Sequence, residues 1–104
     1  MIFDHRTYEP QSGRLRELLA LYEKEGPPVQ KKHLVNFVGF FTTGIGNVHE
    51  ILHIWGSGDL ADRTKRRAAM MSDPARQAYL QKSREYMKHT NNKILVPTGF
   101  SPTN

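Results

Sequence analysis

The first third of the chain combines a loosely alternating segment with a helical pattern. Residues 2–8 are predicted to form a strand, with even-numbered side chains on one face and odd-numbered side chains on the other. A helical stripe follows, because apolar side chains recur at intervals of three and four residues from Leu15 to Tyr22. We expect Ser12 to cap this helix and Gly26-Pro27-Pro28 to end or kink it.

The middle of the chain has the pattern of a β-hairpin. Residues 34–43 are rich in β-branched and aromatic side chains, and a second strand is predicted over residues 48–55. Between them, residues 44–47 (Gly-Ile-Gly-Asn) predict a turn, because glycine and asparagine tolerate positive φ. Both arms carry apolar side chains on both faces, whereas an antiparallel sheet with one face in water alternates cleanly. We therefore predict that both faces of this sheet are covered.

Two consecutive helices are predicted in the last half of the chain. Asp59 is a suitable N-cap for the first, in which apolar side chains recur at helical spacing over residues 60–71. Asp73-Pro74 then starts a second helix, since aspartate is a favoured cap and proline a favoured first-turn residue. We expect this helix to run as far as Thr90-Asn91-Asn92 and a final strand to occupy residues 94–100.

The predicted order is strand, helix, strand, strand, helix pair, strand. This order is that of a ferredoxin-like α+β fold, with a four-stranded antiparallel sheet and helices on one side, formed by residues 1–104 as a single domain. Helices on one face leave the other apolar face without a cover. A second copy of the chain would supply that cover, so we predict a homodimer.

The charge of the chain changes this picture little. Fifteen basic residues against ten acidic ones give a formal net charge of +5, which raises the question of a nucleic-acid partner. The two signs are interspersed, however, and only residues 63–67 form a basic cluster. This cluster lacks the surface aromatics of a single-strand binder, so we interpret it as a solvated helix face and predict no nucleic acid as partner.

Composition also bears on location. No apolar run approaches the roughly 18 residues of a membrane span, and residues 1–6 lack the features of a signal peptide. We therefore expect no membrane association. The absence of cysteine suits a reducing compartment, and we expect a cytoplasmic protein.

Several polar and aromatic side chains fall where the sheet should be covered. Arg6 and Tyr8 share a face of the first strand, and Asn36 lies on the second. Buried polar groups need partners, so we favour pairing of Arg6 with an acidic neighbour such as Asp4 or Glu50. Without such a pair, Arg6 would be a natural clamp for a carboxylate.

Aromatic side chains and one histidine complete this set. Trp55, Tyr79 and Tyr86 can either wall a flat ligand or simply form the core. His53 can be a hydrogen-bonded structural residue, or an acid or base near neutral pH. His49 lies four residues before it, but on a strand the two would be about 13 Å apart, too far to share a metal ion.

Other chemistries find no support. The glycines do not fit a phosphate-binding or dinucleotide loop, and without cysteine there is no thiol nucleophile. No histidine is favoured over another as a haem ligand. We predict neither a metal nor a cofactor.

Short motifs along nearly the whole chain carry a resemblance. They are Arg6-Thr7-Tyr8, Val38-Gly39-Phe40-Phe41-Thr42-Thr43, His53-Ile54-Trp55, Leu60-Ala61-Asp62-Arg63, Asp73-Pro74 and Leu95-Val96-Pro97. In order and spacing the chain resembles the NIPSNAP family. The resemblance implies a dimeric α+β barrel with a site between sheet and helices, within a superfamily that includes antibiotic-type monooxygenases and haem-degrading enzymes. It implies no settled activity for the family itself.

Two departures from the family pattern concern the implied pocket. Ser57 stands where the family usually has a tyrosine, and Arg76 stands where it tends to an aromatic residue. If those aromatics line a pocket, the pocket of this chain is more polar or more open.

These observations together predict a homodimeric small-molecule-binding or accessory protein. Its ligand would be a small hydrophobic or anionic molecule, which the sequence does not identify. The candidate ligand-binding residues are Arg6, Tyr8, Asn36, His53, Trp55 and Tyr79. The alternative is a cofactor-independent monooxygenase that deprotonates a phenolic or quinone-type substrate and lets the carbanion react with oxygen.

Overall fold

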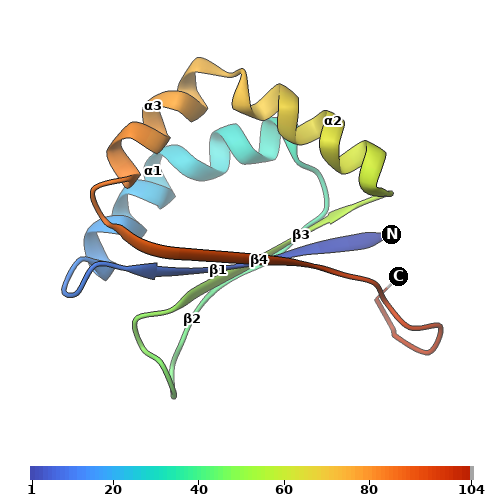
Figure 1. The fold of residues 1–104 in the computed structure, drawn as a ribbon, viewed down its shortest axis with the longest axis horizontal. Coiled ribbons are helices and arrows are strands. Elements are labelled where there is room, and N and C mark those ends of the chain that lie inside the picture. The colour runs from blue at the N-terminus through green and yellow to red at the C-terminus, as the bar shows by residue number, and fades with distance from the viewer. Residues whose placement is uncertain (104) are drawn as a thin grey trace.

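The chain forms a four-stranded antiparallel sheet with three helices packed on one of its faces (Figure 1). The computed structural model describes residues 1–103. The strands lie in the order β2-β3-β1-β4, which confirms the predicted ferredoxin-like fold. The elements are β1 (Ile2–Pro10), α1 (Leu15–His33), β2 (Phe37–Thr42), β3 (Ile51–Ser57), α2 (Leu60–Met71), α3 (Pro74–Ser83) and β4 (Met87–Leu95).

Helix α1 is longer than predicted. It continues through Pro27 and Pro28 to His33, so the prolines do not end the helix, which was one of the two effects expected of them. Packing explains the difference, because the residues on either side of the prolines, Gly26 and Val29, are both buried. The predicted Ser12 cap is also wrong: the N-cap residue is Arg14, which makes no side-chain capping bond.

The caps of the other two helices are as predicted. Asp59 accepts a hydrogen bond from the backbone N–H of Asp62 at the start of α2, at 2.7 Å. Asp73 accepts one from the backbone N–H of Ala75 at the start of α3, at 2.9 Å. Each satisfies a donor that the first turn of a helix leaves free.

The last strand differs most from the prediction. Helix α3 ends at Ser83, and β4 pairs with β1 from Met87 to Leu95. The segment Thr90-Asn91-Asn92, expected to break a helix, instead lies inside this strand. Pairing with β1 outweighs the weak strand propensity of asparagine, which costs little on an exposed edge strand.

The hairpin loop is longer than the predicted four residues. Strand β2 ends at Thr42 and β3 begins at Ile51, so His49 lies in a turn and not on the strand. Thr43 Oγ1 donates a hydrogen bond to the Glu50 carbonyl at 3.0 Å and closes the loop.

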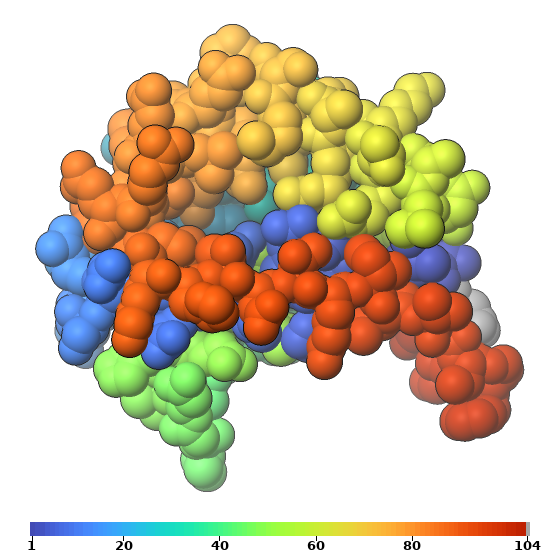
Figure 2. All heavy atoms as spheres, in the orientation of Figure 1, coloured from blue at the N-terminus to red at the C-terminus, as the bar shows by residue number. Residues whose placement is uncertain are grey.

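The two faces of the sheet have different surroundings. The even-numbered residues of β1 face the helices, where buried side chains from all three helices and from β3 form the core. The opposite face carries Val38 and Phe41, each 50% exposed, beside Phe3 and Ile54. Figure 2 shows the hairpin loop and the C-terminal segment projecting beyond the sheet on that side. Across residues 1–103, no helix has the length and apolar character needed to cross a membrane.

Candidate functional site

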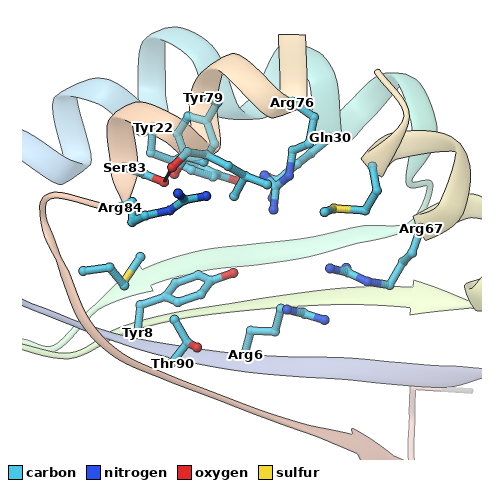
Figure 3. Close-up of a pocket in the computed structure, with 13 residues that line it drawn as sticks. Arg6, Tyr8, Tyr22, Gln30, Arg67, Arg76, Tyr79, Ser83, Arg84 and Thr90 are labelled. Atoms are coloured by element: carbon cyan, nitrogen blue, oxygen red, sulfur yellow. Dashed lines mark hydrogen bonds between the residues drawn. The ribbon is translucent and has the colours of Figure 1, made fainter. Parts of the chain in front are cut away.

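A cavity of about 360 Å³ lies between the sheet and the helices (Figure 3). Its wall combines β1 and β4 below with all three helices above. The lining residues are Arg6, Tyr8, Tyr22, Gln30, Arg67, Met71, Arg76, Tyr79, Leu80, Ser83, Arg84, Met87 and Thr90.

Four of the lining residues are arginines from different elements. Arg6 comes from β1, Arg67 from α2, Arg76 from α3 and Arg84 from the turn after α3. Figure 3 shows their side chains extending toward the same space. Within residues 1–103, no carboxylate side chain lines this cavity. The site is therefore strongly positive.

One buried carboxylate, Asp4, lies beside the cavity and is shared among several guanidinium groups. Arg63 Nε donates to its Oδ2 at 2.8 Å, and Arg6 Nε lies 3.2 Å from its Oδ1. Arg67 Nη1 is more distant, at 4.0 Å. Burial alone would raise the pKa of Asp4, but Arg6, Arg63 and Arg67 outweigh it and lower the pKa below its usual value. The ion pair between Arg6 and Asp4 was among the predicted pairings.

Arg76 has no such partner. Its side chain is buried, with 6% of the residue exposed, and no carboxylate of residues 1–103 lies within ion-pair distance. Its Nε makes no hydrogen bond, and its guanidinium carbon lies 5.3 Å from the centre of the Tyr79 ring. A buried charge without a counter-charge raises the free energy of the folded protein, so an anion bound beside Arg76 would lower it.

Tyrosines form the remaining polar wall. Tyr22 donates a hydrogen bond to Gln30 Oε1, and burial raises its pKa. Burial and the neighbouring Tyr8 also raise the pKa of Tyr79 to about 12. These two phenol groups are thus neutral at physiological pH and can serve as hydrogen-bond donors or as flat walls.

His53 lies behind this wall and not on the cavity surface. It is 1% exposed, and its Nδ1 accepts a hydrogen bond from Trp55 Nε1 at 2.9 Å. Burial, together with the nearby Arg6 and Arg76, lowers its pKa to about 3. The ring is therefore neutral at pH 7, and its proton sits on Nε2 because Nδ1 is an acceptor.

The structure brings half of the predicted site residues to the cavity. Arg6, Tyr8 and Tyr79 line it, while His53 and Trp55 pack behind them. Asn36 lies elsewhere, in a left-handed conformation with φ of 58° that asparagine tolerates, and its carbonyl accepts from the Gly56 N–H.

Tyr86, the third aromatic side chain expected to wall a ligand or join the core, does not line the cavity. Its ring instead stacks on the guanidinium of Arg14 at 4.7 Å.

Several lining residues were missed from the sequence. Arg67 belongs to the basic cluster at residues 63–67, interpreted as a solvated face. In the structure Arg63 and Arg67, four residues apart, instead turn together toward Asp4. This i, i+4 spacing was the available signal. Arg76, which departs from the family pattern, does line the cavity.

No metal site accompanies these groups. Over residues 1–103, no three histidine, aspartate or glutamate side chains gather where they could hold an ion.

Comparisons with known proteins show similarity in both sequence and fold. A NIPSNAP family protein from Agrobacterium tumefaciens (Atu5224) is 35% identical, with 99% of this chain and 98% of that chain covered and a TM-score of 0.95. A second one, Atu4242, of unknown function, is 41% identical over 98% of this chain and 92% of that chain, with a TM-score of 0.92.

A curated relative is much longer. The NipSnap protein K02D10.1 of Caenorhabditis elegans is 27% identical over 101 residues, which is 96% of this chain. The chain spans only 19% of the length of that relative.

More distant structures share the fold alone. An antibiotic biosynthesis monooxygenase is 8% identical, with 94% of this chain and 99% of that chain covered and a TM-score of 0.72. The NIPSNAP family model, in contrast, matches residues 3–102. With nearly its whole length matched, the chain belongs to the NIPSNAP family.

Proposed function

We propose that this protein binds a small organic anion in the cavity between its sheet and helices. The observation that carries the proposal is Arg76, a buried guanidinium that faces the cavity without a carboxylate partner among residues 1–103. An acid group of a ligand would supply the missing counter-charge through charge-assisted hydrogen bonds.

The rest of the cavity favours a ligand with an apolar or aromatic body. Tyr8 and Tyr79 offer flat faces, and Met71, Leu80 and Met87 offer apolar surface. A volume of about 360 Å³ lies near the lower end of typical ligand pockets, which span about 300–1,000 Å³. The ligand is therefore of the size of a substituted single ring.

Binding is better supported than the oxygenase alternative. A cofactor-independent oxygenase needs a base to deprotonate its substrate. His53 does not line the cavity, and its low pKa of about 3 makes it a poor proton acceptor at pH 7. The lining residues are arginines, tyrosines and neutral side chains, which favour holding an anion over abstracting a proton.

We also propose that the protein is a homodimer joined through the open face of the sheet. Val38 and Phe41 leave apolar surface half exposed on that face. Ile45 in the hairpin loop and Phe100 in the C-terminal segment are almost fully exposed on the two projections that flank it (Figure 2). A second copy seated between these projections would bury this surface.

Calorimetric titration with benzoate and phenyl phosphate tests the binding proposal. We expect saturable binding by the wild-type protein and a loss of about 10- to 100-fold in affinity in Arg76→Gln, the range of a charge-assisted hydrogen bond. The matched control is Arg16→Gln, which removes an exposed arginine of α1 and should leave affinity unchanged. The proposal fails if neither compound binds below millimolar concentration, or if Arg76→Gln binds both as the wild type does.

A further inference from the structure

The arrangement of charges around the cavity indicates how many negative charges the ligand carries, and not only that it is an anion. One part of the cavity, called the sheet side below, is formed by Arg6 of β1 and by Arg67, which reaches toward Asp4 of β1 from α2; both share Asp4 with Arg63. On the helix side, Arg76 faces the same space from α3 without any counter-charge among residues 1–103. Asp4 thus partly neutralises the sheet-side arginines, whereas no carboxylate of residues 1–103 forms an ion pair with Arg76.

The sheet-side arginines are themselves only partly neutralised. Arg67 Nη1 is 4.0 Å from Asp4 Oδ2, beyond hydrogen-bond distance, and Arg6 Nε lacks hydrogen-bond geometry toward Asp4 Oδ1. Burial and the like charge of Arg6 lower the pKa of Arg67 to about 10. At Arg67, repulsion from Arg6 therefore exceeds the attraction of Asp4.

A ligand with a single negative charge would satisfy only one side of the cavity. If the acid group of the ligand paired with Arg76, the excess positive charge of Arg6 and Arg67 would remain. If the acid group paired with Arg6 and Arg67 instead, Arg76 would remain without a counter-charge. Two negative charges, on one phosphate group or on two neighbouring carboxylates, can be shared by both sides. Arg84, which is exposed at the rim, adds a further donor for the same group.

We infer that the ligand is a small dianion with an apolar body, a phosphate monoester or a dicarboxylate, held between Arg76 on α3 and the Arg6–Arg67 pair on β1 and α2. This inference rests on the proposed anion-binding function and specifies its ligand class. The hydroxyl groups of Tyr8, Ser83 and Thr90 line the same cavity and can donate to further ligand oxygens.

Affinities for matched ring compounds test the inference. Phenyl phosphate and phthalate carry two charges at pH 7.5, whereas benzoate carries one on a similar body. We expect at least one dianion to bind about 10-fold or more tightly than benzoate, as one further charge-assisted hydrogen bond requires. A preference for phenyl phosphate identifies a phosphate monoester as the ligand class, and a preference for phthalate identifies a dicarboxylate.

The pH dependence supplies an independent readout on the wild-type protein. A phosphate monoester gains its second proton with a pKa of about 6, so phenyl phosphate should bind more weakly at pH 5 than at pH 7.5, while benzoate should not. The cavity itself should keep its charge over this range. Arg67 loses its proton only near pH 10 and Tyr79 only near pH 12, the pKa of Asp4 is lowered, and that of neighbouring His53 is about 3.

Variants separate this inference from the function on which it rests. Arg67→Gln should weaken the binding of dianions more than that of benzoate and so reduce the preference toward equality, whereas Lys65→Gln on the exposed side of α2 should change neither affinity. Equal affinities for benzoate and both dianions, lost together in Arg76→Gln, would overturn the dianion and leave anion binding intact. Binding of none of the three compounds would overturn both.

Discussion

Arg76 occupies a helix position that gave no local reason to expect burial. It lies two residues after Asp73-Pro74, in the first turn of α3, and only the packing of α3 over the sheet turns it toward the cavity. A buried, unpaired charge reduces stability compared with an apolar side chain of similar size. The position therefore combines a stability cost with a charge that a ligand can use.

Replacing this charge should stabilise the protein. For Arg76→Met we expect the free energy of unfolding to rise by about 1 kcal/mol or more, together with the loss of anion binding, because methionine fills similar space without a charge. Urea denaturation at pH 7.5 without ligand measures this effect. Arg16→Met on the exposed face of α1 is the control, with an expected change within about 0.5 kcal/mol. A marked loss of stability in Arg76→Met would mean that the folded chain already neutralises this arginine.

His53 should make stability depend on pH. Its pKa is about 3 in the folded protein against 6.5 for the free side chain, so below pH 6.5 the unfolded chain binds a proton that the folded chain does not. The contribution of neutral His53 to the free energy of unfolding is therefore fully present above pH 6.5 and is lost as the pH falls toward 3. The slope from this one group approaches about 1.4 kcal/mol per pH unit.

Comparison of variants isolates this contribution. We expect His53→Gln to have a flatter dependence of unfolding free energy on pH between 6.5 and 4 than the wild type. His49→Gln, in the exposed turn of the hairpin, should retain the wild-type slope. Parallel curves for His53→Gln and wild type would show that the folded histidine titrates normally.

At the scale of elements, local sequence signals were reliable where the hydrogen bonds that they predict are themselves local. The caps Asp59 and Asp73 start α2 and α3 as predicted, because each carboxylate bonds an N–H two or three residues away. Strand β4 was misplaced because its existence depends on pairing with β1, more than 70 residues away in the sequence. The arginines of the cavity were missed for the same reason: helical spacing does not tell which face of α2 or α3 meets the sheet.

Helix α1 provides a test of packing against propensity. Gly26 lies inside the helix, where alanine would ordinarily stabilise by about 0.5–1 kcal/mol. A Cβ at this position would lie 2.5 Å from Cδ2 of the Tyr22 ring. That ring cannot easily move, because it stacks on Phe40 at 4.3 Å and bonds Gln30.

We therefore expect Gly26→Ala to destabilise the protein by about 1–3 kcal/mol, the range for overpacked sites. Urea denaturation gives the value. Gly44→Ala in the hairpin loop, where nothing lies within 4 Å of the added carbon, should be nearly neutral. If Gly26→Ala instead stabilises the protein, Tyr22 is less firmly held than the structure indicates.

At the scale of the whole molecule, the two faces of the sheet differ in what they present. The face beneath the helices carries the cavity, while the open face carries the apolar surface proposed to join two copies. The sequence predicted apolar side chains on both faces, and the structure shows both. Which polar side chains meet in the cavity depended on the packing of three helices, which no local pattern specifies.

The open face can be tested without disturbing the cavity. We expect Phe41→Lys to shift the protein toward a monomer in sedimentation velocity at micromolar concentration, because a dimer would then bury an unpaired charge. Leu60→Lys replaces a similarly exposed apolar residue at the start of α2 and should sediment as the wild type does. A wild-type protein that sediments as a monomer would contradict the proposed dimer.

The central claim, that Arg76 receives the acid group of a ligand, can be observed at the atom concerned. Nuclear magnetic resonance of arginine Nε–Hε groups follows each guanidinium during titration with phenyl phosphate, and Arg76→Lys identifies the signal of Arg76. We predict a saturable shift of this signal, with the exposed Arg16 unaffected. An Arg76 signal that stays in place up to millimolar ligand, or that moves no more than that of Arg16, would contradict the account.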